Sequence, residues 1–354
     1  MQTVAEFKIE YIQYLDAQGN ATQAFPDFID NALLTTLYKQ MTLTRVLDNK
    51  AINLQRTGKM GTYPASTGHE ASNIGIGYSM SKDDIFCPYY RDQAISLMRN
   101  IKMSEILSYW GGDERACDHP NNQNDFPPCI PIATQCLHAA GVAFALKYRN
   151  KKAAAVTTIG DGGTSKGDFY EAINVAGCWK LPVVFVSINN QWAISVPREK
   201  QTACQTIAQK AIAAGIEGIQ VDGNDVIAVI VAMKHALNKA YNGEGPTLIE
   251  TLTYRLCDHT TADDASRYRD KDEFKKAWEV EPIRRLAKYL ESQGAWSKEK
   301  EAKLQAECTR VVEQAVATYM NQTPQKATDM IDYLFADIPE PLMEQRDEIE
   351  ELSK

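Results

Sequence analysis

The fold is decided by residues 153–190, which read AAAVTTIGDGGTSKGDFYEAINVAGCWKLPVVFVSINN. Two short apolar runs within this stretch, residues 153–159 and residues 181–188, are rich in β-branched side chains and predict buried strands. Because a helix is predicted between them, the stretch forms a βαβ unit. Its two strands are expected to be parallel and joined by a right-handed crossover.

The helix of this unit is predicted from its first residues and from its apolar spacing. Ser165 is followed by Asp168 in a pattern that resembles a capping box, which marks the start of a helix. The apolar residues that recur at helical spacing are Phe169, Ile173 and Ala176. We therefore expect a helix that begins at Ser165.

The same alternation repeats downstream of the unit. The sequence predicts a strand at residues 218–222, a helix at residues 225–241 and a strand at residues 247–254. Strands that alternate with helices in this way define the α/β fold class, with a doubly wound, mainly parallel sheet. In such sheets ligands bind beyond the carboxyl ends of the strands.

The flanking regions differ in composition from this α/β centre. Residues 1–29 are predicted to form an N-terminal arm, residues 30–271 the α/β domain, and residues 272–354 a charged, helical C-terminal extension. A long helix of the extension is predicted to start near Ser297. Residues 111–128 are polar and rich in Gly, Pro and Asn, so we expect a long ordered loop there, and such loops are often functional.

The overall composition excludes several classes of protein. With 44% hydrophobic and 24% charged residues, the chain is neither collagen-like nor disordered, and no apolar run is long enough to span a bilayer. A net charge of −8 argues against nucleic acid as the main partner. The eight cysteines form no CxxC pair, and no signal or transit pattern is visible at the N-terminus, so we expect reduced thiols and a cytoplasmic location.

Polar residues follow both strands of the central unit. Asp161, with Gly162 and Gly163, comes directly after the first strand, and Asn190 follows the second. Because the carboxyl ends of parallel strands meet at one edge of a sheet, we expect these residues to lie together. A carboxylate and an amide oxygen suit Mg²⁺, and glycines allow a phosphate to approach the backbone. The alternative is a tight turn without a ligand. The separation of 29 positions between Asp161 and Asn190 argues against it, because that length accommodates one crossover helix and one strand.

The GDG sequence followed about thirty positions later by NN is the motif of thiamine-diphosphate enzymes. The whole stretch resembles the alpha subunit of the decarboxylating component of 2-oxo-acid dehydrogenase complexes, most closely the bacterial members that act on pyruvate. The resemblance extends over nearly the whole chain. It includes MTLTRVLDNKAINLQRTGKMGTYPASTGHEA (residues 41–71), PYYRDQ (88–93), AAGVAFALKYRNKKA (139–153), NGEGPTLIETLTYR (242–255) and DHTTADDASRYR (258–269).

This resemblance implies a metal site and part of a cofactor site. Asp161, Asn190 and the backbone carbonyl of Trp192 would hold Mg²⁺, with Trp192 standing where the family usually has Tyr or Phe. Gly162 and Gly163 would contact the diphosphate of thiamine diphosphate.

The resemblance also implies roles for residues outside the central unit. Tyr90 and Arg91 match a Tyr-Arg pair that binds the diphosphate, a task that suits the guanidinium fork. Ile132 matches the residue whose backbone reaches the aminopyrimidine ring. Residues 133–135, Ala-Thr-Gln, replace the family's Gly-Ala-Gln. His259 matches a functional histidine in a loop of the family.

His259 is also singled out by its position. It lies in a polar loop just past the predicted strand at residues 247–254, and therefore at the carboxyl edge of the sheet. Imidazole titrates near neutrality, so we expect it to deliver a proton to a lipoyl sulfur or to hydrogen-bond an intermediate. Ion pairs are expected to order this loop. The charged residues that could form them are Asp263, Asp264, Arg267 and Arg269.

The function implied by the resemblance is oxidative decarboxylation of pyruvate, with acetyl transfer to the lipoyl group of an acyltransferase core. A beta subunit is expected to supply the glutamate that activates the cofactor, in an α2β2 heterotetramer. Branched-chain 2-oxo acids and acetoin remain alternative substrates. A non-catalytic scaffold is a further alternative, but it would have no need for a complete cofactor site.

Overall fold

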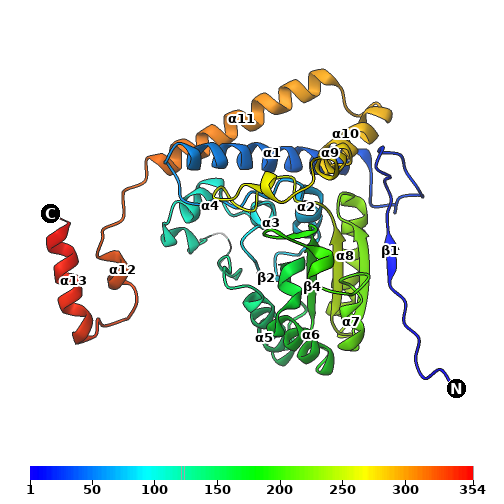
Figure 1. Ribbon diagram of the computed structural model, residues 1–354, viewed down its shortest axis with the longest axis horizontal. Helices are drawn as coiled ribbons and strands as arrows, with labels where there is room; N and C mark the ends of the chain where they lie inside the picture. Colours follow the sequence, from blue (N-terminus) through cyan, green and yellow to red (C-terminus); the bar gives the residue numbers. More distant parts are fainter. Residues whose placement is uncertain (121, 123, 354) are drawn as a thin grey trace.

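A computed structural model describes residues 1–120, 122 and 124–353. At its centre is a six-stranded sheet with the order β1-β7-β8-β4-β3-β2, in which every neighbouring pair is parallel (Figure 1). The strands are β1 (Glu10–Ile12), β2 (Ile85–Cys87), β3 (Ala155–Gly160), β4 (Val183–Asn189), β7 (Glu217–Asp222) and β8 (Thr247–Leu252). A separate antiparallel hairpin consists of β5 (Trp192–Ala193) and β6 (Val196–Pro197).

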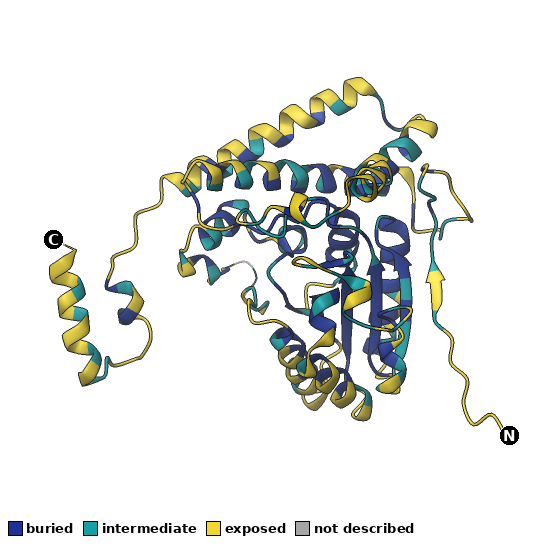
Figure 2. Cartoon of the chain, in the orientation of Figure 1, coloured by how far each residue is buried: buried dark blue, intermediate teal, exposed yellow. Residues whose placement is uncertain are grey.

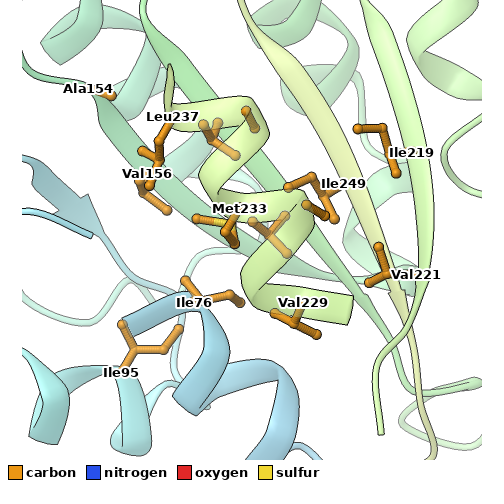
Figure 3. Close-up of a cluster of buried hydrophobic side chains, with 14 of the residues drawn as sticks. Ile76, Ile95, Ala154, Val156, Ile219, Val221, Val229, Met233, Leu237 and Ile249 are labelled. Atoms are coloured by element: carbon orange, nitrogen blue, oxygen red, sulfur yellow. The ribbon is translucent and has the colours of Figure 1, made fainter. Parts of the chain in front are cut away.

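Helices cover both faces of the sheet, as predicted for a doubly wound fold. On one face α2 (Glu70–Ser79), α3 (Gln93–Met98) and α8 (Val226–Tyr241) pack on the sheet, and α5 (Thr134–Tyr148) and α6 (Gly167–Cys178) pack on the other. The alternation of side chains along β4 explains this, because Val184 faces the first group and Val183 the second. Figure 3 shows the first of these clusters, in which side chains of α8 lie against Val156, Val221 and Ile249.

The βαβ unit forms as predicted, except at the start of its helix. Asp161–Ser165 forms a 3₁₀ turn, η2, and α6 begins only at Gly167. The predicted capping box is therefore wrong, because Ser165 belongs to η2 and the extended residue Lys166 is the N-cap of α6. A hydrogen bond of 2.7 Å from the Thr164 hydroxyl to the Asp161 carbonyl oxygen closes the 3₁₀ turn.

The strand predicted at residues 247–254 ends earlier, at Leu252. The predicted helix at residues 225–241 is α8, with Asp225 as its N-cap. Of the loop predicted at residues 111–128, positions 121 and 123 lie outside the described residues, and its described part contains a short 3₁₀ turn, η1 (Glu114–Cys117).

The N-terminal arm contributes to the sheet, since β1 pairs with β7 at its edge. The long helix α1 (Asn31–Arg56) packs against α2, α10 and α11. The predicted division at residues 29 and 271 stays a prediction. The remaining helical elements are α4 (Met103–Trp110), η3 (Arg198–Lys200), α7 (Lys210–Ala213), η4 (Ala265–Arg267), α9 (Lys271–Glu279), α10 (Pro282–Ser292), α11 (Lys298–Met320), α12 (Asp329–Asp332) and α13 (Glu340–Leu352).

Ser297 is the N-cap of α11, as predicted. Figure 1 shows α11 alongside α1, and α12 and α13 apart from the main body. Figure 2 shows that the central strands of the sheet are buried, whereas the edge strand β1 and the outer sides of α5, α6 and α11 are exposed. In the part of the chain that the structure describes, none of the helices combines the length and the apolar character that a bilayer crossing requires.

Candidate functional site

The two strands of the βαβ unit, β3 and β4, end at the same carboxyl edge of the sheet. Gly160 of β3 lies opposite Ile188 of β4, so Asp161 and Asn190 leave the sheet side by side, as predicted. A cavity of about 470 Å³ opens at this edge. Every residue predicted for the site lines it, namely Tyr90, Arg91, Ile132, Asp161, Gly162, Gly163, Asn190, Trp192 and His259.

Asp161 is a buried carboxylate that forms no ion pair with any of the described residues. Its side chain accepts a hydrogen bond of 3.0 Å from Gln201 Nε2, and the residue is only 3% exposed. Burial raises the pKa of Asp161 to about 6. The hydrogen bond from Gln201 lowers the pKa, but its effect is smaller than that of burial. A cation beside this carboxylate would remove the cost of burying its charge.

Asn190 and Trp192 supply neutral oxygens next to Asp161. Asn190 Oδ1 accepts a hydrogen bond from the Trp192 backbone N–H at 3.1 Å, and the Trp192 carbonyl accepts one from Arg255 Nη1 at 3.3 Å. No cluster of three or more His, Cys, Asp or Glu side chains suited to a metal occurs in the described residues. A site with one carboxylate, one amide and one carbonyl oxygen fits Mg²⁺ if ligand oxygens or water complete its coordination.

The two glycines of η2 are required by close packing. A Cβ atom on Gly162 would lie 2.4 Å from Ala193 Cβ, and one on Gly163 would lie 2.6 Å from Ile159 Cγ1. Neither position has room for a side chain. The backbone of η2 is therefore held closely against the β5–β6 hairpin and β3, and both glycines line the cavity.

Arg91 is a second buried, charged residue of the cavity wall. The residue is 1% exposed, and its guanidinium donates to the carbonyl oxygens of Ala65 at 2.6 Å and His259 at 2.8 Å. No described carboxylate forms an ion pair with it. The Tyr90 ring centre lies 5.6 Å from this guanidinium, and the ring packs edge-on against the His259 ring. Arg91 thus presents a positive charge that an anionic ligand can balance.

His259 is held as a neutral imidazole by its surroundings. Its Nδ1 lies 3.3 Å from Arg91 Nη2 and 3.4 Å from Arg255 Nη1. Because guanidinium groups only donate, Nδ1 is assigned as the acceptor and Nε2 carries the proton. Burial, followed by the charges of Arg91 and Arg255, lowers the pKa of His259 to about 3. So low a pKa disfavours the expected delivery of a proton by His259, whereas the expected hydrogen bond to an intermediate is compatible with the geometry, and both roles stay predictions.

The loop around His259 is ordered by hydrogen bonds rather than by the predicted ion pairs. Asp263 Oδ2 accepts from the His259 backbone N–H at 2.8 Å and from the Tyr268 hydroxyl. Asp264 caps η4 through the N–H of Ser266. Among the described residues no Asp–Arg ion pair forms within this loop. The carboxylates instead satisfy nearby donors of the loop itself.

Ile132 lies at the cavity wall, is exposed, and directly precedes the N-cap of α5. That N-cap, Ala133, has a φ of 71°, in the left-handed region. Glycine adopts this conformation without cost, which accounts for the glycine that the family usually has there. Gln135 also lines the cavity and donates to the Thr158 carbonyl oxygen at 2.8 Å.

Two contributors to the site were missed by the sequence reasoning. Arg255 connects the β5–β6 hairpin with the loop of His259. It donates to the carbonyl oxygens of Trp192 and Ile194 and contacts His259. A basic residue just after a strand at the carboxyl edge is a signal that could have revealed it. Gln201 contacts Asp161 from 40 positions away, and no local pattern predicts such a contact.

A buried carboxylate, two glycines and an uncompensated arginine around one cavity define a site for an anionic ligand and a cation at the edge of an α/β sheet. The chain belongs to the dehydrogenase E1 component family, whose pattern matches residues 38–328. It is 43% identical, over 96% of this chain and 92% of the relative, to the pyruvate dehydrogenase E1 component subunit alpha of Staphylococcus aureus strain Mu50. The corresponding protein of Bacillus subtilis is 43% identical over 94% of this chain and 90% of its own length. That of Staphylococcus epidermidis is 41% identical over 96% of this chain and 92% of its own length.

Proposed function

We propose that this chain is the alpha subunit of a pyruvate dehydrogenase, which oxidatively decarboxylates pyruvate and transfers the acetyl group to a lipoyl group of an acyltransferase core. The observation that carries the proposal is the one cavity that gathers Asp161, Asn190, Arg91 and His259. The identity of 43% to relatives named as pyruvate dehydrogenase alpha subunits supports the choice of substrate.

The cofactors of this proposal are thiamine diphosphate and Mg²⁺. Asp161, Asn190 and the Trp192 carbonyl would hold the metal, and Gly162 and Gly163 would lie against the diphosphate. When bound, thiamine diphosphate supplies the electron sink for the carbanion that remains when CO₂ leaves a 2-oxo acid. Membership of the dehydrogenase E1 family supports this cofactor.

The other predicted residues of the cavity would bind the cofactor and orient the reacting groups. Arg91 would balance diphosphate charge, with Tyr90 packed beside it, and the backbone of Ile132 would position the aminopyrimidine ring. His259, the proposed catalytic residue, presents its Nε2–H as a hydrogen-bond donor toward the reacting groups. A neutral imidazole donates such a bond without the desolvation cost of a buried cation.

The proposal requires a second chain, a beta subunit in an α2β2 heterotetramer. Activation of the cofactor needs a carboxylate against the aminopyrimidine, and Asp161 is the only acidic side chain among the described residues that line the cavity. An exposed apolar face on α5 and α6 supports a partner beside the cavity. It consists of Leu137, Phe144, Tyr148, Val175 and Trp179. All eight cysteines are free, which favours assembly in the reducing cytoplasm.

The test is to purify the chain alone and together with the beta subunit of its own organism. We expect the isolated chain to show no turnover of pyruvate and no tight cofactor binding, and the pair to release CO₂ from pyruvate when thiamine diphosphate and Mg²⁺ are added. Branched-chain 2-oxo acids and acetoin serve as the comparison substrates. Turnover by the isolated chain would contradict the two-chain assignment, and preference for a comparison substrate would contradict pyruvate.

A further inference from the structure

A buried lysine lies directly behind the turn that carries Asp161. Lys210, the first residue of α7, is only 3% exposed. Its Nζ donates to the Thr164 carbonyl oxygen at 2.7 Å and to the Thr164 hydroxyl at 3.0 Å. The ammonium group also lies 5.1 Å from the centre of the Tyr170 ring. Lys210 is therefore fixed in place by three contacts.

These contacts continue to the carboxylate-bearing residue. The Thr164 hydroxyl, which accepts from Lys210, donates to the Asp161 carbonyl oxygen at 2.7 Å. Lys210, Thr164 and Asp161 thus form one chain of hydrogen bonds that links α7 to the first residue of η2. Removal of the ammonium group would leave two buried acceptors of Thr164 without their donor, at the turn that must keep its shape.

Lys210 also carries a charge that no ion pair balances among the described residues. No carboxylate among the described residues forms an ion pair with it, and burial lowers its pKa against the weaker, opposing effects of Cys204 and Asp161. Lysines are seldom buried without such a partner. A negatively charged ligand on the other side of η2 would stabilise this charge across the turn.

We propose that Lys210 is a positioning residue for the diphosphate end of the cofactor site, which it serves by holding η2 in its binding shape and by placing a positive charge behind it. This inference rests on the proposed function, because it takes thiamine diphosphate with Mg²⁺ as the ligand. Lys210 does not line the cavity and acts on the ligand only through η2.

The test compares three variants of the chain, each purified with the beta subunit. Lys210→Met removes donor and charge, Lys210→Arg keeps both, and Lys239→Met is the matched control. The Lys239 side chain is also largely buried, but it binds Glu217 and the Pro246 carbonyl at the amino ends of β7 and β8, the opposite edge of the sheet. Isothermal titration with thiamine diphosphate and Mg²⁺ gives the Kd and the fraction of competent sites separately.

We expect Lys210→Met to raise the Kd about 10- to 100-fold, the range found when a residue that orients a metal ligand is removed. Lys210→Arg should recover most of the affinity, and Lys239→Met should lower thermal stability without changing the Kd. A merely structural role would reduce the fraction of competent sites and leave the Kd unchanged, and that result would overturn the inference.

Should Lys210→Met fail to assemble, Thr164→Val takes its place, because it removes the hydroxyl link and keeps the ammonium group. A wild-type Kd for Thr164→Val would equally overturn the inference. The wild-type pair is titrated first. If the wild-type pair does not bind thiamine diphosphate, the proposed function itself is contradicted. If the wild-type pair binds it and Lys210→Met has the same Kd, only the role of Lys210 is contradicted.

Discussion

Asp161 shows how a single residue can be costly for the fold and useful for the site. The carboxylate is buried without an ion pair, and its pKa is raised by that burial. Gln201 orients it, and Arg255 donates to the Trp192 carbonyl of the same cavity. Carboxylates with a strongly perturbed pKa cluster at functional sites, where a ligand can compensate their charge.

We expect Asp161→Asn and Asn190→Ala each to abolish Mg²⁺-dependent binding of thiamine diphosphate by the assembled protein. The neutral amide of Asp161→Asn removes the buried charge, so this variant should remain at least as stable as the wild type at pH 7. Calorimetric titration measures the affinity, and thermal unfolding serves as the control for folding. Unchanged affinity in either variant would remove that residue from the metal site.

His259 gives a pH-dependent prediction. Its folded-state pKa of about 3 lies below the ordinary value of 6.5, so the unfolded chain binds this proton more tightly. The contribution of His259 to stability is therefore complete above about pH 6.5 and is lost as the pH falls toward 3. We expect His259→Gln to reduce the acid-induced loss of stability in this window, measured by urea unfolding without cofactor. An identical pH profile for the variant would contradict the lowered pKa.

At the scale of elements, the loop that carries His259 is positioned by a turn before α2. The Gly68 carbonyl oxygen accepts a hydrogen bond from the Thr253 hydroxyl at 2.7 Å, and the Leu256 N–H donates to the Thr67 carbonyl oxygen at 3.0 Å. Gly68 has a φ of +101°, and a Cβ atom there would lie 2.2 Å from the Tyr254 carbonyl oxygen. Only glycine permits this approach of the turn to the segment that follows β8.

We expect Gly68→Ala to lower the free energy of unfolding by roughly 2–4 kcal/mol, because a clash adds to the backbone strain. Gly58→Ala is the matched control. Gly58 also has a positive φ, of +69°, but its Cβ position is open, so about 1 kcal/mol of strain is expected. Urea unfolding of both variants measures the difference. Equal losses would show that the contact with Tyr254 is unimportant.

At the scale of the whole molecule, the apolar face on α5 and α6 is the feature that the isolated chain does not explain. Phe144 of α5 and Trp179, which follows α6, lie 5.2 Å apart between ring centres, and both are exposed. Large aromatic side chains on neighbouring helices form a contiguous surface of the kind that protein partners cover. The face begins at Leu137 in the first turn of α5, the turn whose Gln135 lines the cavity, and it extends toward the other end of α5 at Phe144.

We expect Phe144→Asp, alone or with Trp179→Asp, to weaken assembly with the beta subunit by at least about tenfold, since a charge would be buried in an apolar interface. Met320→Asp, which changes an exposed apolar residue at the end of α11, is the control and should assemble normally. Analytical ultracentrifugation of mixtures gives the dissociation constants. Normal assembly of Phe144→Asp would place the partner on another surface.

The α/β class, the parallel order of β3 and β4, and the meeting of Asp161 with Asn190 could be predicted from the sequence alone. These depend on local information, namely strand and helix periodicity and the length of one crossover, and the GDG and NN motifs lie inside that single unit. The resemblance to a family then supplied Tyr90, Arg91, Ile132 and His259, all of which line the same cavity.

The electrostatic character of the site could not be predicted in this way, because it arises from contacts between distant segments. Arg91, Arg255 and His259 come from two distant segments, and their mutual contacts set the protonation of the imidazole. The contacts of Gln201 and Lys210 with η2 likewise join residues 36 or more positions apart. A pKa depends on burial and on charges brought together by folding, and neither quantity is a property of the local sequence.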